Sequence, residues 1–239
     1  MDDVPFLPPR SAPQAAADST QTAPRALRLQ RLSDARRELV LDAARTVFAE
    51  KGLEGASIRE IARQAGYTPG AIYSYFDSKE AVYAALLAES LDRLQAEVDA
   101  APVEHGHPDR NLQAKAQAWF GFYARNPRDL DLGFYLVHGL APRGLTAPLN
   151  QALNERLLAA LQPCEQALQG LGLAPEVARR EQAALFAHGV GLLLLQHTGR
   201  IRLFGESAAP LFQAYLDALL NRLVPGERER GEGRGELFA

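Results

Sequence analysis

The stretch TPGAIYSYFDSKEAV gathers the side chains of this chain that are best suited to contact another molecule. Gly70 and Ala71 are small enough to let the backbone come close to a surface, and Tyr73 offers a flat apolar face that ends in a hydroxyl group. Arg59 and Lys79 add a full positive charge on either side. Small residues, a tyrosine and two cations suit contact with a groove flanked by phosphates, which is the chemistry of DNA binding.

Other kinds of chemistry are not indicated by the spacing of reactive side chains. The sequence has no glycine-rich phosphate loop, no nucleophile beside a base and no paired carboxylates in apolar surroundings, so we expect no enzyme activity. His105 and His107 fall in a predicted loop, while His188 and His197 lie nine residues apart on opposite sides of a predicted helix. The single Cys164 forms no internal disulfide. We therefore expect no metal site and no cofactor.

Helix-capping signals predict the elements that hold the stretch in place. A first helix is expected from Ser33 to about Lys51, because Gly52 is a natural stop. The residues SIRE form a capping box, in which the Ser57 hydroxyl accepts from the Glu60 N–H and the Glu60 side chain reaches back. The helix that they begin is expected to end at the next glycine.

A third, short helix is expected after a two-residue turn. Thr68 is its predicted N-cap and Pro69 its first residue, where a missing N–H costs nothing. It is expected to end near Phe76, before Asp77 caps a long fourth helix. A helix this short is only marginally stable on its own. We therefore expect Ile72 and Phe76, which lie four residues apart on one face, to anchor it in the core. The residues left on the outward side are Pro69, Gly70, Ala71, Tyr73 and Ser74.

Composition and turn signals predict an all-α protein. Ala, Leu, Glu, Gln and Arg are abundant, and no alternating strand pattern is present. Breaks such as NP, APRG and GLGLAP separate further helices, which are expected at 109–125, 129–140, 148–170, 175–198 and 207–223. The expected units are a disordered N-terminal arm (1–27), a three-helix helix-turn-helix DNA-binding domain (28–80), a C-terminal helical bundle (81–224) and a flexible tail (225–239).

The charge distribution indicates a partner near the amino-terminal end. Residues 25–79 carry ten Arg and Lys against seven Asp and Glu, whereas the rest of the chain carries sixteen against twenty-two. This small excess favours a polyanionic partner. The longest apolar run is too short to span a bilayer, and the first 24 residues hold five prolines and no signal-peptide core. We expect a cytoplasmic protein without a membrane partner.

The residues IREIARQAGYTPGAIYSYFDSKEAV, with ARTVFAEKGLEGASI before them, resemble the N-terminal domain of the TetR family of transcriptional regulators. The resemblance covers about residues 33–82 and depends on the order of small residue, tyrosine, aromatic residue and lysine. It implies a homodimer that binds a palindromic operator in double-stranded DNA, most often as a repressor. It also implies that a small-molecule effector, which the sequence does not identify, binds the C-terminal bundle, shifts the two DNA-reading heads and releases the DNA.

The resemblance implies DNA contacts at eight positions of the recognition helix and its surroundings. These positions hold Ser57, Arg59, Thr68, Gly70, Ala71, Tyr73, Tyr75 and Lys79. Tyr75 stands where many members have histidine, which favours a packing role for it. Pro69 and Gly70 replace side chains that read bases elsewhere. Specificity is therefore expected to depend on DNA shape and on Arg59, Thr68 and Ser74.

The C-terminal half resembles the family only in being helical and of suitable length. Its last two helices are apolar over wide faces, which burial within a monomer would explain. The resemblance points instead to a four-helix dimer interface, where Gly189 and Gly191 would let helices approach closely. Aromatic residues gather in the segment 119–138, either as ordinary core or as the lining of an effector pocket. The pocket candidates are Trp119, Phe122, Tyr123, Phe134, Tyr135 and His138.

The sequence leaves two functions open. The leading one is a ligand-responsive, DNA-binding transcriptional regulator. The alternative is a helical protein-interaction module that keeps the fold without DNA binding, since helix-turn-helix shapes also occur in proteins that never touch DNA. Protein binding that persists when Arg59, Tyr73 and Lys79 are all replaced would favour the alternative.

Overall fold

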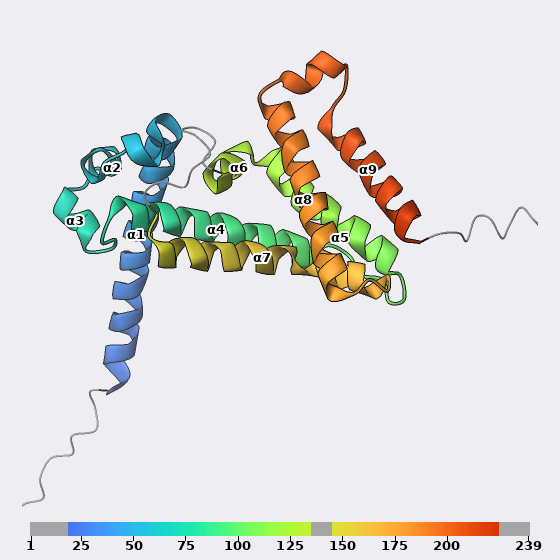
Figure 1. Cartoon of the computed structure of the whole chain (residues 1–239). Coiled ribbons are helices and arrows are strands. Elements are labelled where there is room, and N and C mark those ends of the chain that lie inside the picture. The colour runs from blue at the N-terminus through green and yellow to red at the C-terminus, as the bar shows by residue number, and fades with distance from the viewer. Residues whose placement is uncertain (1–18, 135–144, 225–239) are drawn as a thin grey trace, which may run out of the picture.

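The structure, a computed structural model, describes residues 19–134 and 145–224 of the 239-residue chain. These residues fold into helices, and no strand is found among them. Figure 1 shows α1, α2 and α3 at one end and α4 leading from them into the remaining helices. In chain order the elements are α1 (Ser19–Gly55), α2 (Ile58–Ala65), α3 (Pro69–Tyr73), α4 (Lys79–Ala100), α5 (Pro108–Arg125), α6 (Pro127–Phe134), α7 (Ala147–Gly170), α8 (Pro175–His197), the 3-10 helix η1 (Arg200–Phe204) and α9 (Ala208–Leu223).

The first hydrophobic core is enclosed by α1, α2, α3 and the start of α4. Each of these helices places one fully buried side chain in it, namely Leu41, Ile61, Ile72 and Val82, all 0% exposed. Burying a side chain of this size stabilises the fold by about 1.5–3 kcal/mol. Because each helix contributes to the same core, the four pieces form one packed unit around the short α3.

The second core lies in the bundle. Leu94, Leu112, Leu168, Leu193 and Leu216 come from α4, α5, α7, α8 and α9 in that order, and each is 0% exposed. In Figure 1, α7 runs beside α4, and α8 crosses α5 with α9 next to it. The predicted all-α architecture, with a helix-turn-helix domain followed by a helical bundle, is confirmed.

Helix α4 belongs to both cores. Leu86 packs in the first core and its neighbour Leu87 in the second. The Tyr83 hydroxyl donates to the Leu132 carbonyl of α6 at 2.6 Å, which adds a polar link between the start of α4 and the bundle. One uninterrupted helix therefore connects the two cores.

Helix α1 is longer than predicted. It begins at Ser19, so residues 19–27, for which the sequence predicts disorder, are helical. Strong helix formers are frequent from residue 25 onward, in RALRLQRL, and favour the helix there, whereas residues 19–24, STQTAP, are mostly weak helix formers. At the other end Gly52, with φ 66°, interrupts the helix where the stop was expected. Residues 1–18 of the predicted arm and the predicted tail, 225–239, lie outside the described residues.

Other helix ends differ by smaller amounts. The N-cap of α4 is Ser78 rather than Asp77, and the Ser78 hydroxyl accepts from the Ala81 N–H at 3.2 Å. Both residue types cap helices well, so local preference did not separate the two positions. Helix α3 ends at Tyr73, earlier than predicted. Helix α6 begins at Pro127, two residues before the predicted start, and residues 135–140 of the predicted helix lie outside the described residues.

Candidate nucleic-acid interface and ligand cavity

Capping bonds fix the position of α3 beside α2. The Ser57 hydroxyl accepts from the Glu60 N–H at 3.3 Å and donates to the Glu60 carboxylate at 2.9 Å. The Lys51 ammonium, helped by the Ser57 hydroxyl, holds the pKa of the Glu60 carboxyl group below its ordinary value. After the turn, Thr68 Oγ1 accepts from the Ala71 N–H at 3.3 Å, as the N-cap prediction requires. The turn between the two helices is therefore set by bonds among near neighbours.

Helix α3 has one buried side and one exposed side. Ile72 is 0% exposed and Phe76, just beyond the helix, is 5% exposed, whereas Tyr73 is 54% exposed. The predicted anchors are thus inside and the predicted tyrosine is outside, while Ala71 is partly buried. The other exposed residues of this face are Thr68, Pro69, Gly70 and Ser74.

Gly70 of α3 and Ser74, the C-cap of that helix, differ in what they offer to a partner. A Cβ added at Gly70 would meet no heavy atom within 4 Å, so the protomer itself leaves that place open. The Ser74 hydroxyl donates to the Ala71 carbonyl at 2.6 Å. Because that proton is used inside the helix, Ser74 offers an outside partner only the acceptor capacity of its oxygen.

Lys79 is engaged inside the domain. Its ammonium donates to the carbonyl oxygens of Leu53 at 2.8 Å and of Glu54 and Ala56, both at 3.1 Å. An ammonium has three donors, and all three are used here. Lys79 therefore ties the start of α4 to the connection between α1 and α2, and no N–H is left for the phosphate contact that the family resemblance implies.

Arg59 and Tyr75 differ in how far they are exposed to solvent. Arg59 is exposed near the start of α2, beside the N-cap Ser57, and has no ion pair within the described part of the chain. Tyr75 is partly buried and packs against the first core, in keeping with the packing role expected for it.

The predicted pocket residues of α5 pack ring against ring in the second core. Trp119 and Tyr123 are each 1% exposed and Phe122 is 3% exposed. The Trp119 ring lies 5.2 Å from the ring of Phe186 in α8, centroid to centroid. Burial raises the pKa of the Tyr123 phenol above its ordinary value. In this structure the three side chains of α5 serve as core.

The remaining predicted pocket residues lie at or beyond the end of α6. Phe134 is partly buried, and its ring centroid is 6.0 Å from that of Phe186. Tyr135 and His138 lie outside the described residues. Phe186 therefore joins the aromatic groups of α5 and α6, although the sequence pattern did not single it out.

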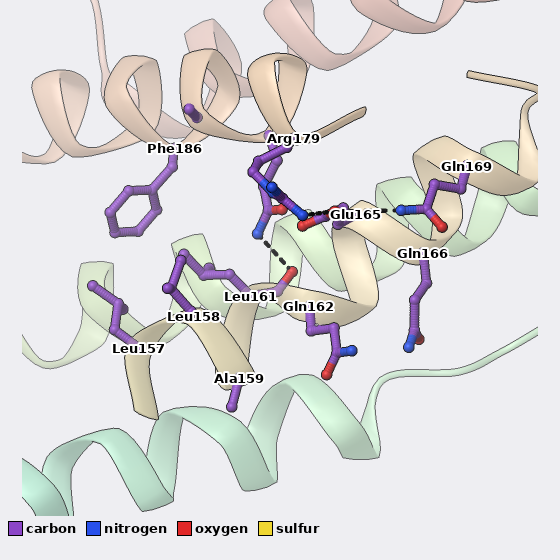
Figure 2. A pocket seen from close by; sticks show the side chains of 12 residues that line it. Leu157, Leu158, Ala159, Leu161, Gln162, Glu165, Gln166, Gln169, Arg179 and Phe186 are labelled. Carbon is purple, nitrogen blue, oxygen red and sulfur yellow. Dashed lines mark hydrogen bonds and ion pairs between the residues drawn. The ribbon is translucent and has the colours of Figure 1, made fainter. Parts of the chain in front are cut away.

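A cavity of about 710 Å³ opens between α7 and α8. Figure 2 shows Phe186, Leu157 and Leu158 toward one end and Gln166 and Gln169 toward the other. Phe186 lines this cavity and also contacts Trp119 of α5, but none of the predicted pocket residues that the structure describes is in the lining. The lining residues are Leu157, Leu158, Ala159, Leu161, Gln162, Glu165, Gln166, Gln169, Arg179, Gln182, Ala183 and Phe186.

Polar contacts bridge the two walls of the cavity. Arg179 of α8 lies 3.6 Å from the Glu165 carboxylate of α7, and the buried Gln182 donates to the Leu161 carbonyl at 2.9 Å (Figure 2). A signal for this wall was present in the sequence, because glutamines 162, 166 and 169 recur at the three- and four-residue spacing of one helix face. The aromatic cluster was the more conspicuous pattern, and it led to the core instead.

The two glycines of α8 have different surroundings. A Cβ on Gly189 would lie 2.3 Å from Trp119 and 3.0 Å from Phe212, so this glycine allows α8 to pack on α5 and α9 within the protomer. The close approach expected at a dimer interface is, for Gly189, a contact inside the chain. Gly191 is exposed, and a Cβ there would have no heavy atom within 4 Å.

The described residues contain neither a metal-binding cluster nor a helix that could span a membrane. Across 19–134 and 145–224, no group of three or more His, Cys, Asp or Glu side chains is arranged to hold a metal ion. None of the helices described has the length and apolar character required to cross a membrane. Cys164 is buried in the second core, and burial raises the pKa of its thiol to about 12.

The first domain matches a known family. The model of the bacterial regulatory proteins, tetR family, matches residues 40–86. The HTH-type transcriptional repressor KstR2 of Rhodococcus jostii (strain RHA1) is 46% identical over 59 residues, which are 25% of this chain and 29% of that protein. The chain therefore spans less than a third of the length of this relative.

Solved structures resemble the chain over both domains. A bacterial regulatory protein in the tetR family from Rhodococcus RHA1 is 20% identical, with a TM-score of 0.60 over 79% of this chain and 96% of that one. The transcriptional regulator FadR from Bacillus subtilis, in complex with stearoyl-CoA, is 23% identical, with a TM-score of 0.54 over 79% and 98%. At these identities the likeness establishes the fold alone. Residues 40–86 thus resemble the bacterial regulatory proteins, tetR family, and the chain shares its fold with a solved tetR-family regulatory protein.

Proposed function

We propose that this protein is a transcriptional repressor that binds a palindromic DNA operator as a homodimer and leaves it when a small-molecule effector binds. The observation that carries the proposal is the two-sided helix α3, in which Ile72 is 0% exposed and Tyr73 is 54% exposed. A short helix anchored in this way fits the major groove with its outer side toward the bases. The match of residues 40–86 to the tetR family model and the similarity to the repressor KstR2 over 59 residues support the same activity.

Residues on the outer side of α2 and α3 are assigned to DNA contact. The open space around Gly70 supports a close approach of its backbone to the DNA, with Tyr73 beside it. The exposed Arg59 supplies a positive charge for a phosphate or a base edge. Lys79 acts by holding the connection before α2 in place. The complete proposed contact set is Ser57, Arg59, Thr68, Gly70, Ala71, Tyr73 and Ser74, while Tyr75 and Lys79 are proposed to position it.

The homodimer is proposed to form through the outer faces of α8 and α9. Ala184, Ala187 and Gly191 are exposed and recur at the spacing of one face of α8, and Ala214 and Ala218 do so on α9. Small residues let the helices of a partner copy come close. An Ala187→Arg variant should run as a monomer in sedimentation experiments, while an Arg at the exposed Ala96 of α4 should leave the dimer intact.

The effector is proposed to bind in the cavity between α7 and α8. Its volume of about 710 Å³ lies in the range of small-molecule sites, about 300–1,000 Å³. Leucines and Phe186 at one end and glutamines at the other suit a ligand with an apolar part and a polar part (Figure 2). FadR, which shares the fold, holds stearoyl-CoA, a ligand of that kind.

Helix α4 is the proposed link between the effector and the DNA. It lies against α7, which forms one wall of the cavity, and it also contributes to the core around α3. If the effector binds more tightly when α7 is in one placement than in another, its binding shifts α7 toward the first placement. Helix α4, which packs against α7, would then move, and the helix-turn-helix would move with it. The aromatic cluster contacts the cavity through Phe186. We therefore propose that its other members transmit the effect of effector binding and do not contact the effector themselves. These members are Trp119, Phe122, Tyr123 and Phe134.

The test is selection from a random duplex library with the full-length protein, repeated with candidate effectors. We expect enrichment of a short inverted repeat whose half-sites are about one helical turn, ~34 Å, or a multiple apart. An effector should remove this enrichment, and an Ala183→Trp variant that fills the cavity should no longer respond to it. The Ala96→Trp variant on the exposed side of α4 is the matched control. Enrichment of no sequence, or an affinity independent of salt, would rule out the proposed function.

A further inference from the structure

The amino-terminal part of α1 extends beyond the domain that it belongs to. Residues 27–36, here named the projecting segment, are all exposed. They include Leu27, Leu29 and Leu32, which are 53%, 59% and 48% exposed. Figure 1 shows this part of α1 pointing away from the other helices. Ten residues add about 15 Å of helix, and packing within the protomer does not account for them.

The positive charge of the helix-turn-helix domain is concentrated in and next to the projecting segment. Residues 25–37 carry five arginines and one acidic residue, whereas residues 38–79 carry five basic and six acidic residues. Three of the latter cations are engaged inside the protein: Arg45 pairs with Asp42 and Glu89, Lys51 pairs with Glu60, and Lys79 binds carbonyl oxygens. The packed part of the domain therefore has little free positive charge to neutralise phosphates.

The projecting segment begins beside the recognition helix. The Arg37 guanidinium lies over the Phe76 ring, 5.2 Å from its centroid, and Phe76 follows closely after α3. From that point Arg36, Arg31 and Arg28 continue along α1 and away from the core. Within the described residues these three arginines have no ion pair or hydrogen bond, so their donors are available.

We propose that the projecting segment lies along the DNA backbone outside the half-site that α3 reads, with Arg28 and Arg31 bound to phosphates. The two residues are three positions apart and so lie on neighbouring parts of one helix face. Duplex DNA presents one phosphate charge for about every 1.7 Å of its axis, so a helix alongside it meets several. Such contacts raise affinity without reading sequence. This inference depends on the proposed function, because it extends the same DNA interface.

The exposed leucines favour a different occupant, a second copy of the chain or another protein. Leu29 and Leu32 are three residues apart and are both exposed, at 59% and 48%. We favour DNA because the segment carries unpaired arginines and begins beside the end of α3. A protein contact would appear as a change in the association state of the free protein, and this gives the experiment a second measurement.

The experiment compares two double variants of the full-length protein on two duplexes. Arg28→Ala with Arg31→Ala removes two charges from the projecting segment. Arg200→Ala with Arg202→Ala removes two exposed charges from η1, which lies between α8 and α9, and serves as the control. One duplex carries only the selected inverted repeat, and the other adds about ten base pairs, one helical turn, on each side. Binding constants are measured over a range of salt concentrations.

On the long duplex we expect the slope of log affinity against log salt to fall by about two per bound protomer in the segment variant, because each phosphate that is no longer neutralised lowers it by about 0.9. The control should keep the wild-type slope. On the short duplex the segment variant and the wild type should bind alike. Hydroxyl-radical footprints should show protection beyond the repeat for the wild type, and the variant should leave those flanking nucleotides open to cleavage.

Several outcomes would overturn the inference. An unchanged slope on the long duplex would show that the arginines do not contact DNA, and an equal decrease on both duplexes would place their contacts inside the half-sites. An altered association state of the segment variant in the absence of DNA, together with a wild-type slope, would assign the segment to a protein contact. In each case the wild type still selects its repeat and the proposed function stands. If the wild type selects no sequence, both proposals fail.

Discussion

The indole ring of Trp119 occupies the space directly beside Gly189, where a Cβ would lie 2.3 Å from Cη2 of the tryptophan. The two residues come from α5 and α8, and Phe212 of α9 closes the same space at 3.0 Å. Three helices of the bundle thus meet at a place where only a hydrogen atom fits. Trp119 also contacts Phe186, which lines the cavity of the proposed effector site.

The first prediction concerns Gly189→Ala. The added methyl group has to displace an aromatic ring in a packed core, so we expect the free energy of unfolding to fall by about 1–3 kcal/mol. The control is Gly191→Ala on the same helix, where the added Cβ has open space and helix propensity improves by about 1 kcal/mol. Urea denaturation of both variants measures the difference. Equal stabilities would mean that the rings beside Gly189 relax without cost.

The second prediction separates the two sides of α3. Ile72→Ala removes a fully buried side chain and should lower the free energy of unfolding by about 2–5 kcal/mol. Tyr73→Ala alters an exposed side chain and should change it by no more than about 0.5 kcal/mol. In DNA-binding titrations Tyr73→Ala should weaken binding to all sequences. A folded Tyr73→Ala variant that binds the selected repeat as tightly as the wild type contradicts the proposed role of this face.

The third prediction concerns Lys79→Met. The change keeps an unbranched side chain but leaves three carbonyl oxygens without their donor, and one such unsatisfied group costs about 1–3 kcal/mol of stability. Arg63→Met, which removes an exposed charge from α2, is the control and should have little effect on unfolding. Thermal or urea unfolding provides the measurement. If Lys79→Met unfolds like the wild type while its DNA-binding slope falls by about one, the lysine contacts phosphate instead.

The fourth prediction is a pH dependence of stability. His188 stacks on Tyr215 with the ring centroids 4.0 Å apart, and its Nε2 is buried without a hydrogen-bond partner in the described residues. Burial lowers the pKa of His188 from its ordinary value. Below an unfolded pKa of about 6.5 the unfolded chain therefore binds more protons than the folded one at this residue. The stability that neutral His188 contributes is present above that pH and is lost as the pH falls.

A His188→Phe variant tests this sign. It keeps an aromatic ring for Tyr215 and removes the titrating group, so its free energy of unfolding should decline less than that of the wild type between about pH 7.5 and 5. A substitution of the exposed His105 by Asn should leave the wild-type curve unchanged. Parallel curves for the wild type and His188→Phe would show that His188 titrates alike in both states.

Features that depend on near neighbours were predictable from the sequence. Thr68 caps α3 by a bond to the N–H three residues later, and Ser57 does the same for α2. The division between Ile72 and Tyr73 follows from the helical period, because adjacent residues on a helix point about 100° apart. These relations need no knowledge of the rest of the chain. The sequence by itself therefore determined the helix-turn-helix, its buried side and its exposed side.

Only the tertiary structure decided the partners that come from distant parts of the chain. Lys79 binds carbonyl oxygens 23 to 26 positions earlier, and no pattern around it distinguishes that role from a phosphate contact. Gly189 meets Trp119 across two helices, and the cavity arises where α7 and α8 diverge. Helical period fixes which face of a helix is apolar but not which other helix will cover it. Burial depends on how the helices pack against one another. The same packing determines whether an aromatic side chain lines a cavity or fills a core.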